Sequence, residues 1–158
     1  MKKCFVVLLT VVVTYCASSQ NSSMSKVEYA IIAEGKDAII PDLHITCFNK
    51  YFNQDYLSPD FRSRYNLNTK ELYKKKMLVE IFRNDINKKG FDKIELIKVV
   101  ENNESIIVEY KHINSDRTND ELNLCAFIII QLPKSKKQIK FIADGIELSH
   151  AKDIYIDK

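Results

Sequence analysis

The residue types that most often carry out chemistry are few in this chain of 158 residues, and their spacing matches no familiar motif. The three histidines are His44, His112 and His150, and none has a second histidine four residues away, as a metal-binding helix requires. A serine hydrolase would need a Gly-x-Ser-x-Gly turn, which is absent, and three scattered glycines cannot form a phosphate-binding loop. We therefore assign no catalytic, cofactor-binding or metal-binding residue.

Acidic residues gather in one loop, INSDRTNDEL, which covers residues 113 to 122. Asp116, Asp120 and Glu121 could offer oxygen ligands to Ca²⁺, but their spacing fits no EF-hand, and such loops are typically solvated turns. No two acids stand out as a glycosidase pair. An enzyme of another type would need a cleft lined by tyrosine, histidine and carboxylates with perturbed pKa values. His112 lies near a predicted strand end, where we expect an exposed polar side chain.

Two of the four cysteines remain once an N-terminal signal is removed, namely Cys47 and Cys125. In an exported protein these two can form a disulfide. The alternative is a pair of buried free thiols, because free cysteine is among the most buried residue types and Cys125 lies inside an apolar strand. The chain has no Cys-x-x-Cys and no Cys/His cluster, which argues against a structural zinc site.

The N-terminus reads MKKCFVVLLTVVVTYCASSQNSS and is typical of a secretory signal. Two lysines precede an apolar stretch of Cys4 to Tyr15, and small and polar residues follow. The apolar stretch is shorter than the roughly 20 residues that a membrane-spanning helix needs. We predict an exported protein that resides in the periplasm or the outer envelope.

The cleavage site has two alternatives. Cleavage after Ser19 would make residues 1–19 the signal peptide, followed by a flexible tether at 20–26. Cleavage before Cys16 would make residues 1–15 the signal and would attach a lipid to the Cys16 thiol, as in a lipoprotein. Tyr15 departs from the small residue that the lipoprotein pattern has before the cysteine. A lipid at Cys16 would be the only contact with the membrane.

The charge balance gives no electrostatic basis for binding nucleic acid. The chain has 24 Lys and Arg and 21 Asp and Glu, and the loss of Lys2 and Lys3 with the signal leaves an excess of one positive charge. The lysines at 74–76 and in the corner at 134–140 form short runs at turns, which are typical of solvated surface. Lysine also protects sheet edges against pairing with other chains.

Most of the chain after residue 76 predicts strands. The stretch CAFIIIQLPKSKKQIKF, residues 125 to 141, begins with a strand that is apolar on both faces and is therefore expected to be covered on both sides. Pro133 ends it, and residues 138–143 alternate as a strand with one wet face does. Residues 91–100 change phase after Leu96, which predicts a β-bulge. The expected strands are 27–33, 43–46, 77–83, 91–100, 105–113, 122–132, 138–143 and 146–148.

One helix is expected in TCFNKYFNQDYL, residues 46 to 57. Its four aromatic residues recur at helical spacing, and Thr46 could cap the first turn. We expect this aromatic face to pack on the core rather than to stack on a ligand. Residues 57–68 then form an irregular connection. The prediction for residues 27–158 is a single α+β domain: a mainly antiparallel, curled sheet of about five to seven strands packed with one main α-helix.

Four short motifs between Lys70 and Phe141 resemble the PrcB-like family, the protease complex subunit family of bacterial envelope proteins. They are KKMLVEIFRN, a Gly-aromatic step before IELIKV, Leu-Pro-Lys at the end of the long strand, and Ile-Lys-Phe after it. The sequence departs from the family at Lys88-Lys89-Gly90-Phe91, where Thr-Gly-Gly-Tyr is common, at Asn84, where glycine is usual, and at Ala126, where proline is usual.

The resemblance implies an exported, non-catalytic protein that binds and stabilises a protease complex of the cell envelope. The expected partner is thus an envelope protease or another envelope protein, with no cofactor and no nucleic acid. The residues alone leave two alternatives open. One is a stand-alone binder of a small ligand, with a pocket between helix and sheet. The other is a peptidase inhibitor, which only an inhibition assay would separate.

Overall fold

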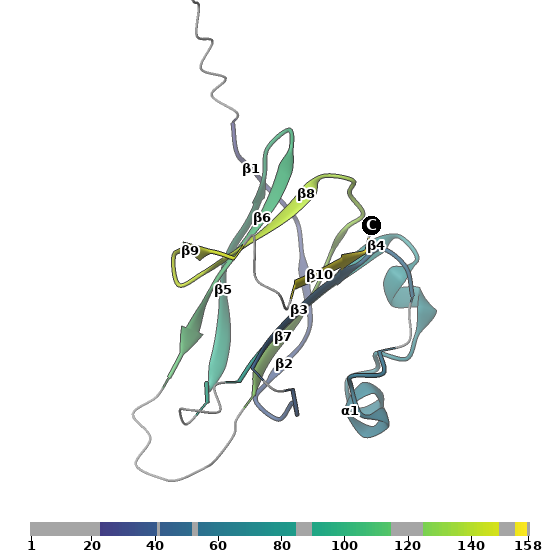
Figure 1. Cartoon of the computed structure of the whole chain (residues 1–158). Helices are drawn as coiled ribbons and strands as arrows, with labels where there is room; N and C mark the ends of the chain where they lie inside the picture. The colour runs from purple at the N-terminus through teal and green to yellow at the C-terminus, as the bar shows by residue number, and fades with distance from the viewer. Residues whose placement is uncertain are drawn as a thin grey trace, which may run out of the picture.

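The computed structural model describes residues 23–40, 42–51, 54–84, 90–114, 125–148 and 154–157, the last segment as backbone only (Figure 1). The predicted signal peptide, the lipid site at Cys16 and residues 20–22 of the tether lie outside the described residues. So do His150 and the three acids of the calcium-candidate loop. No helix in the described part of the chain is long and apolar enough to cross a membrane.

In the described part of the chain, ten strands form two five-stranded sheets that we call sheet A and sheet B. Neighbouring strands are antiparallel, except that β6 is parallel to β8 and β10 is parallel to β3. Sheet A has the strand order β1 (Ser25–Lys26), β5 (Lys93–Glu101), β6 (Ser105–Ile113), β8 (Gln138–Ala143) and β9 (Ile146–Glu147). Sheet B has the strand order β10 (Ile154–Asp157), β3 (Leu43–Phe48), β4 (Lys76–Arg83), β7 (Ala126–Pro133) and β2 (Ala30–Gly35).

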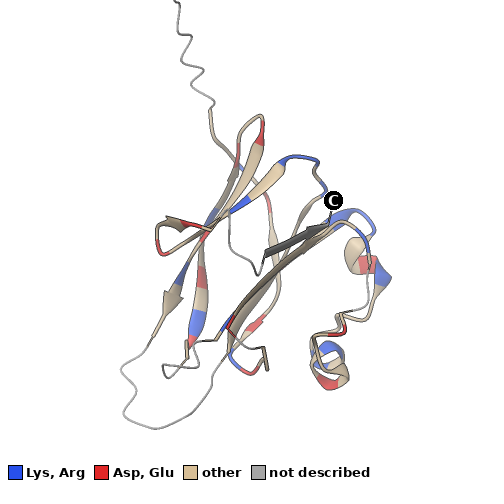
Figure 2. Ribbon diagram, in the orientation of Figure 1, with Lys and Arg blue, Asp and Glu red and all other residues tan. Residues whose placement is uncertain are grey.

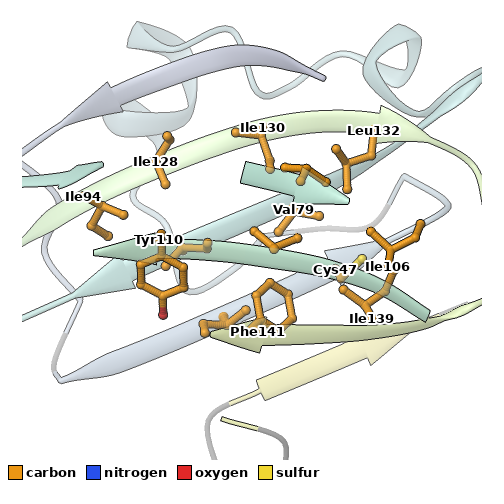
Figure 3. Close-up of a cluster of buried hydrophobic side chains, with 14 of the residues drawn as sticks. Cys47, Val79, Ile94, Ile106, Tyr110, Ile128, Ile130, Leu132, Ile139 and Phe141 are labelled. Carbon is orange, nitrogen blue, oxygen red and sulfur yellow. The ribbon is translucent and has the colours of Figure 1, made fainter. Parts of the chain in front are cut away.

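The main hydrophobic core fills the space between the two sheets (Figure 3). Sheet B contributes alternate residues such as Val79 and Ile128, and sheet A contributes residues such as Val108 and Phe141. The intervening residues of β7, Phe127 and Ile129, point into a second core on the other side of sheet B. The prediction that this strand is covered on both sides is therefore confirmed.

The second core is closed by one small helix and a 3-10 turn. Helix α1 (Pro59–Arg64) begins where Ser58 accepts a hydrogen bond from the backbone N of Phe61 at 3.1 Å, with proline in the first turn. The 3-10 turn η1 (Lys70–Tyr73) begins at Thr69 in a similar way. The rings of Phe61 and Phe127 lie 5.0 Å apart, so α1 is fastened to sheet B by aromatic contact.

The predicted main helix is wrong. Thr46 and Phe48 belong to strand β3, which pairs with β4 along its whole length, and the helix forms instead at 59–64, in the segment expected to be irregular. The strand is favoured because Ile45 and Cys47 fill the inter-sheet core while Thr46 and Phe48 face the opposite side. The fold is mainly antiparallel β-sheet, as predicted, but its strands are divided between two sheets.

The predicted bulge in β5 is confirmed. The pairing of β5 with β6 shifts between Leu96 and Lys98, so Ile97 has no partner and is 48% exposed. The exposed positions of these two strands carry paired charges, as the interspersed colours in Figure 2 illustrate. Lys98 lies 2.8 Å from Glu109, for example, and such surface pairs contribute little to stability.

The N-terminal segment belongs to both sheets. Strand β1 pairs with β5 in sheet A, and the backbone N of Val27 donates to the carbonyl of Val99 at 3.0 Å. A few residues later the same segment becomes β2 and pairs with β7 in sheet B. Glu34 still reaches across to Lys93 of β5 at 3.8 Å. One continuous stretch therefore runs along β5 while it changes sheets.

Candidate functional site

A pocket of about 320 Å³ opens between the two sheets at one end of the sandwich. Its wall comes from both sheets, because the last residues of β4, β6 and β8 meet here with the first residue of β3. The parallel pairing of β6 with β8 places Tyr110 opposite Ala143, and both residues line the pocket. The lining residues are Leu43, Arg83, Phe91, Tyr110, His112, Ala143, Asp144, Ile146 and Leu148.

His112 and Asp144 form a close pair at the pocket. Asp144 lies in the turn after β8 with a positive φ of 51°, which aspartate tolerates. Its Oδ2 lies 2.6 Å from Nδ1 of His112, and its Oδ1 accepts from the backbone N of His112 at 2.9 Å. Desolvation raises the pKa of Asp144, but these hydrogen bonds outweigh it and lower the pKa below its ordinary value. The carboxylate is therefore ionised.

The paired aspartate also fixes the hydrogen-bonding character of the imidazole. In the neutral ring, Nδ1 carries the proton and donates it to Asp144, so Nε2 is an acceptor. Nε2 of His112 is buried and has no hydrogen-bond partner among the residues that the structure describes. The ring stacks at 4.6 Å on Phe91, which holds it in place.

Tyr110 supplies a second polar atom at the same place. Its side chain is fully buried, and its hydroxyl has no hydrogen-bond partner within the described segments. Figure 3 shows the ring in the inter-sheet core with the hydroxyl at its far end. Burial raises the pKa of Tyr110, so the hydroxyl stays protonated and can donate. An unpaired buried polar group costs about 1–3 kcal/mol, and two in one pocket indicate a place for a ligand.

Arg83 lies at the rim, and its charge is balanced. Its Nη1 lies 2.6 Å from Oδ1 of Asp42, and its guanidinium lies over the ring of Phe91, 5.9 Å from the centroid. With Asp144 paired to His112, the pocket has apolar walls and no charged group left without a close polar contact. Such a site can bind and orient a largely neutral group.

Sequence reasoning missed this pocket because it expected His112 to be exposed, and that prediction is wrong. The side chain is 9% exposed. The signal was present in the alternation of β6, in which Ile106, Val108 and Tyr110 face the core and His112 is next in the same row. Asp144 and Arg83 gave no signal, since each lies some 30 residues from His112 in sequence.

The two cysteines are not brought together. Cys47 lies in the inter-sheet core, where its Sγ is 4.0 Å from Sδ of Met77, and Cys125 lies in the second core on the opposite face of sheet B. Both are free thiols in the structure. Burial raises the pKa of the Cys125 thiol to about 11, which keeps it protonated and unreactive.

A buried carboxyl group lies on the other face of sheet B. Glu80 of β4 is fully buried and receives hydrogen bonds from Tyr56, from Nε2 of Gln54 and, at 3.0 Å, from Oγ1 of Thr46. Burial raises the pKa of Glu80 to about 7, although the bonds from Tyr56 and Thr46 lower it. Gln54 and Tyr56 lie before α1 in a segment that has neither helix nor strand. Their hydrogen bonds to Glu80 therefore hold this segment against sheet B.

A second pocket of about 340 Å³ lies beside Tyr56, between the 37–39 segment and α1. The ligand-binder alternative expected a pocket between the sheet and a helix at 46–57; that helix does not form, and this pocket lies at α1 instead. Glu80 does not line it, and its polar groups are the exposed ion pair of Asp37 with Arg64 and the residues at the start of α1. Within the described segments, no group of three His, Cys, Asp or Glu side chains is placed to hold a metal ion.

Comparison with known proteins found no matching family model, no matching curated protein and no matching solved structure. The likeness to the PrcB-like family therefore rests on the short motifs alone. In the fold these motifs surround the inter-sheet space. Gly90 has a φ of 70° and directs Phe91 to the pocket, while Leu132 and Phe141 lie in the core.

Proposed function

We propose that this chain is an exported, non-catalytic protein that binds another protein of the cell envelope as an accessory subunit, and that the pocket between the sheets receives a side chain of that partner. The observation that carries the proposal is the pair of buried, unpartnered polar atoms, Tyr110 Oη and Nε2 of His112, inside an otherwise apolar pocket. The resemblance to protease complex subunits suggests an envelope protease as the partner.

The size and chemistry of the pocket support recognition of a projecting side chain. Its volume of about 320 Å³ is at the small end of the range for ligand pockets. Ile146 at the mouth is 67% exposed, which leaves an apolar contact surface at the rim. A buried anchor in a pocket with an apolar rim is the arrangement that concentrates binding energy in protein interfaces.

The same pocket has the tyrosine, histidine and carboxylate that an enzyme would need, with shifted pKa values at Tyr110 and Asp144, but it lacks the commonest nucleophiles of covalent catalysis. None of its lining residues is a serine, cysteine, threonine or lysine that could act as a nucleophile. A stand-alone binder of small molecules is the second candidate, and the mostly apolar lining with a few polar groups favours it. The two functions differ in whether a protein partner is recovered with the chain.

An affinity pull-down tests the proposal. The full-length protein with a C-terminal tag is recovered from its native envelope fraction at several salt concentrations, and intact-mass analysis of the bait shows whether Cys16 carries lipid. We expect a stoichiometric envelope protein with the wild type and its loss with Ile146→Arg, which places a charge at the pocket mouth. Ile31→Arg is the matched control, because Ile31 is 49% exposed on β2, away from the pocket.

Recovery of the bait alone with the wild type would count against a stable complex and would favour the small-ligand binder. Loss of the partner with Ile31→Arg but not with Ile146→Arg would move the interface to the β2 edge and would contradict the role of the pocket.

A further inference from the structure

The hydrogen-bonding pattern of the pocket restricts what it can bind. His112 offers a lone pair at Nε2, because Asp144 engages the proton on Nδ1 at 2.6 Å. Tyr110 offers an O–H that nothing in the described structure accepts. The rings of Tyr110 and His112 lie 5.4 Å apart, centroid to centroid, so a ligand between them can meet both atoms if it presents one N–H or O–H donor and one acceptor.

The charges around the pocket disfavour ionised ligands. A carboxylate would place its lone pairs against the lone pair of Nε2, and Nη1 of Arg83 is already engaged by Asp42 at 2.6 Å. An ammonium group would compete with His112 for Asp144 and would also lie near Arg83. Since desolvating a charge without a partner is costly, a neutral group is favoured.

The remaining wall is aliphatic and aromatic. Leu43, Phe91, Ile146 and Leu148 surround the polar pair, so the ligand should carry its polar group on a short apolar stem. A volume of about 320 Å³ is the space of about ten water molecules, which is ample for a single side chain and small for a large cofactor.

We infer that the pocket recognises a carboxamide on a short aliphatic stem, as in an asparagine or glutamine side chain of the partner. The amide N–H would bind Nε2 of His112, and the amide oxygen would accept from the Tyr110 hydroxyl. A carboxamide is neutral and has a donor and an acceptor on one carbon, which satisfies both buried atoms at once. This inference rests on the proposed function only for the source of the amide, not for its chemistry.

The test is a titration of the purified, exported form of the protein with isobutyramide, followed by NMR of the imidazole of His112 and the methyl groups of Leu43 and Leu148. The experiment is run at pH 8, where an ordinary imidazole is neutral. Isobutyrate and 3-methyl-2-butanone have nearly the same shape, but the first is charged and the second lacks the N–H donor. We expect saturable shifts with isobutyramide only.

Tyr110→Phe removes the donor and keeps the ring, so we expect about tenfold weaker binding of isobutyramide, the ordinary effect of one lost hydrogen bond. Tyr51→Phe is the control, because Tyr51 is 39% exposed and does not line the pocket. Equal binding of isobutyrate or of the ketone, or no shift at His112 with isobutyramide, would overturn the inference.

A competition experiment identifies the source of the amide. Isobutyramide added to the pull-down should elute the partner, whereas isobutyrate at the same concentration should not. If isobutyramide still shifts His112 but no partner is recovered, the pocket recognises a carboxamide that does not come from a partner protein. The proposed function would then be wrong, while the inference about the ligand chemistry would hold.

Discussion

Replacing Glu80 by glutamine should raise the stability of the protein relative to the wild type as the pH increases from 4 to 8, because the variant avoids ionisation of a buried carboxyl group. Glu80 is fully buried, and its carboxyl is surrounded by donors from Thr46, Gln54 and Tyr56. Burial nevertheless raises its pKa from 4.5 to about 7, which means that desolvation of the ionised form outweighs these hydrogen bonds. Glutamine has the same shape and never ionises.

The sign and size of the pH effect follow from the difference between the pKa values of Glu80 in the folded and the unfolded chain. A carboxyl whose pKa is higher in the folded than in the unfolded chain contributes most stability below pH 4.5, and this contribution is lost as the pH rises toward 7. Each unit of difference is worth about 1.4 kcal/mol, so ionised Glu80 costs the folded protein about 3 kcal/mol above pH 7. The free energy of unfolding of Glu80→Gln minus that of the wild type should therefore increase by about 3 kcal/mol between pH 4 and pH 8.

The assay is urea unfolding of both proteins at a series of pH values, followed by far-ultraviolet circular dichroism. The difference between the two proteins cancels the titration of all other groups that the substitution leaves unchanged. Glu95→Gln is the control, because Glu95 is half exposed, pairs with Lys111 on the surface and should change the stability by less than about 1 kcal/mol. A difference that is flat with pH, or that decreases as the pH rises, would refute the reasoning, since the three donors would then outweigh the desolvation.

Three further predictions concern the two cores and the pocket. Tyr110→Phe should leave the stability unchanged or raise it by about 1 kcal/mol in the free protein, because it removes a buried hydroxyl that has no partner among the described residues; thermal unfolding checks this. Phe61→Ala should destabilise the fold by about 3–5 kcal/mol in urea unfolding, because it empties the aromatic contact that holds α1 on sheet B. Cys47 and Cys125 should react with a thiol reagent only in denaturant, and reductant should not shift the unfolding midpoint; fast alkylation of the folded protein would contradict their burial.

The sequence was informative wherever one local pattern had one structural solution. The run in β7 could be recognised because a strand that is apolar on both faces must be covered twice, and the change of phase in β5 had no simpler cause than a bulge. The helix was misplaced because Thr46 and Phe48 fit both the start of the helical pattern and the alternation of a strand. Pairing with β4, which only the three-dimensional structure supplies, decided between the two.

The candidate site could not be predicted from any one segment. Arg83, His112 and Asp144 come from three separate strand ends, and only the parallel pairing of β6 with β8 places His112 beside the turn that contains Asp144. The sequence gives a weaker indication of the buried Glu80, because it is the single acid between Leu78 and Phe82 in an otherwise apolar part of β4. A buried acid of this kind indicates a partner, but its sequence neighbours do not identify Gln54 and Tyr56 as that partner.

The continuous segment from β1 to β2 forms one edge of each sheet. It occupies the outer edge of β7 along Phe127 to Gln131 and the end of β5 at Val100 and Glu101. If this segment detached, the unpaired backbone of both strands would become available to other molecules, and on β7 the newly open edge belongs to an almost wholly apolar strand. A cut or truncation within residues 25–35 should therefore promote aggregation, because it would expose the unpaired edges of β5 and β7 to pairing with other chains.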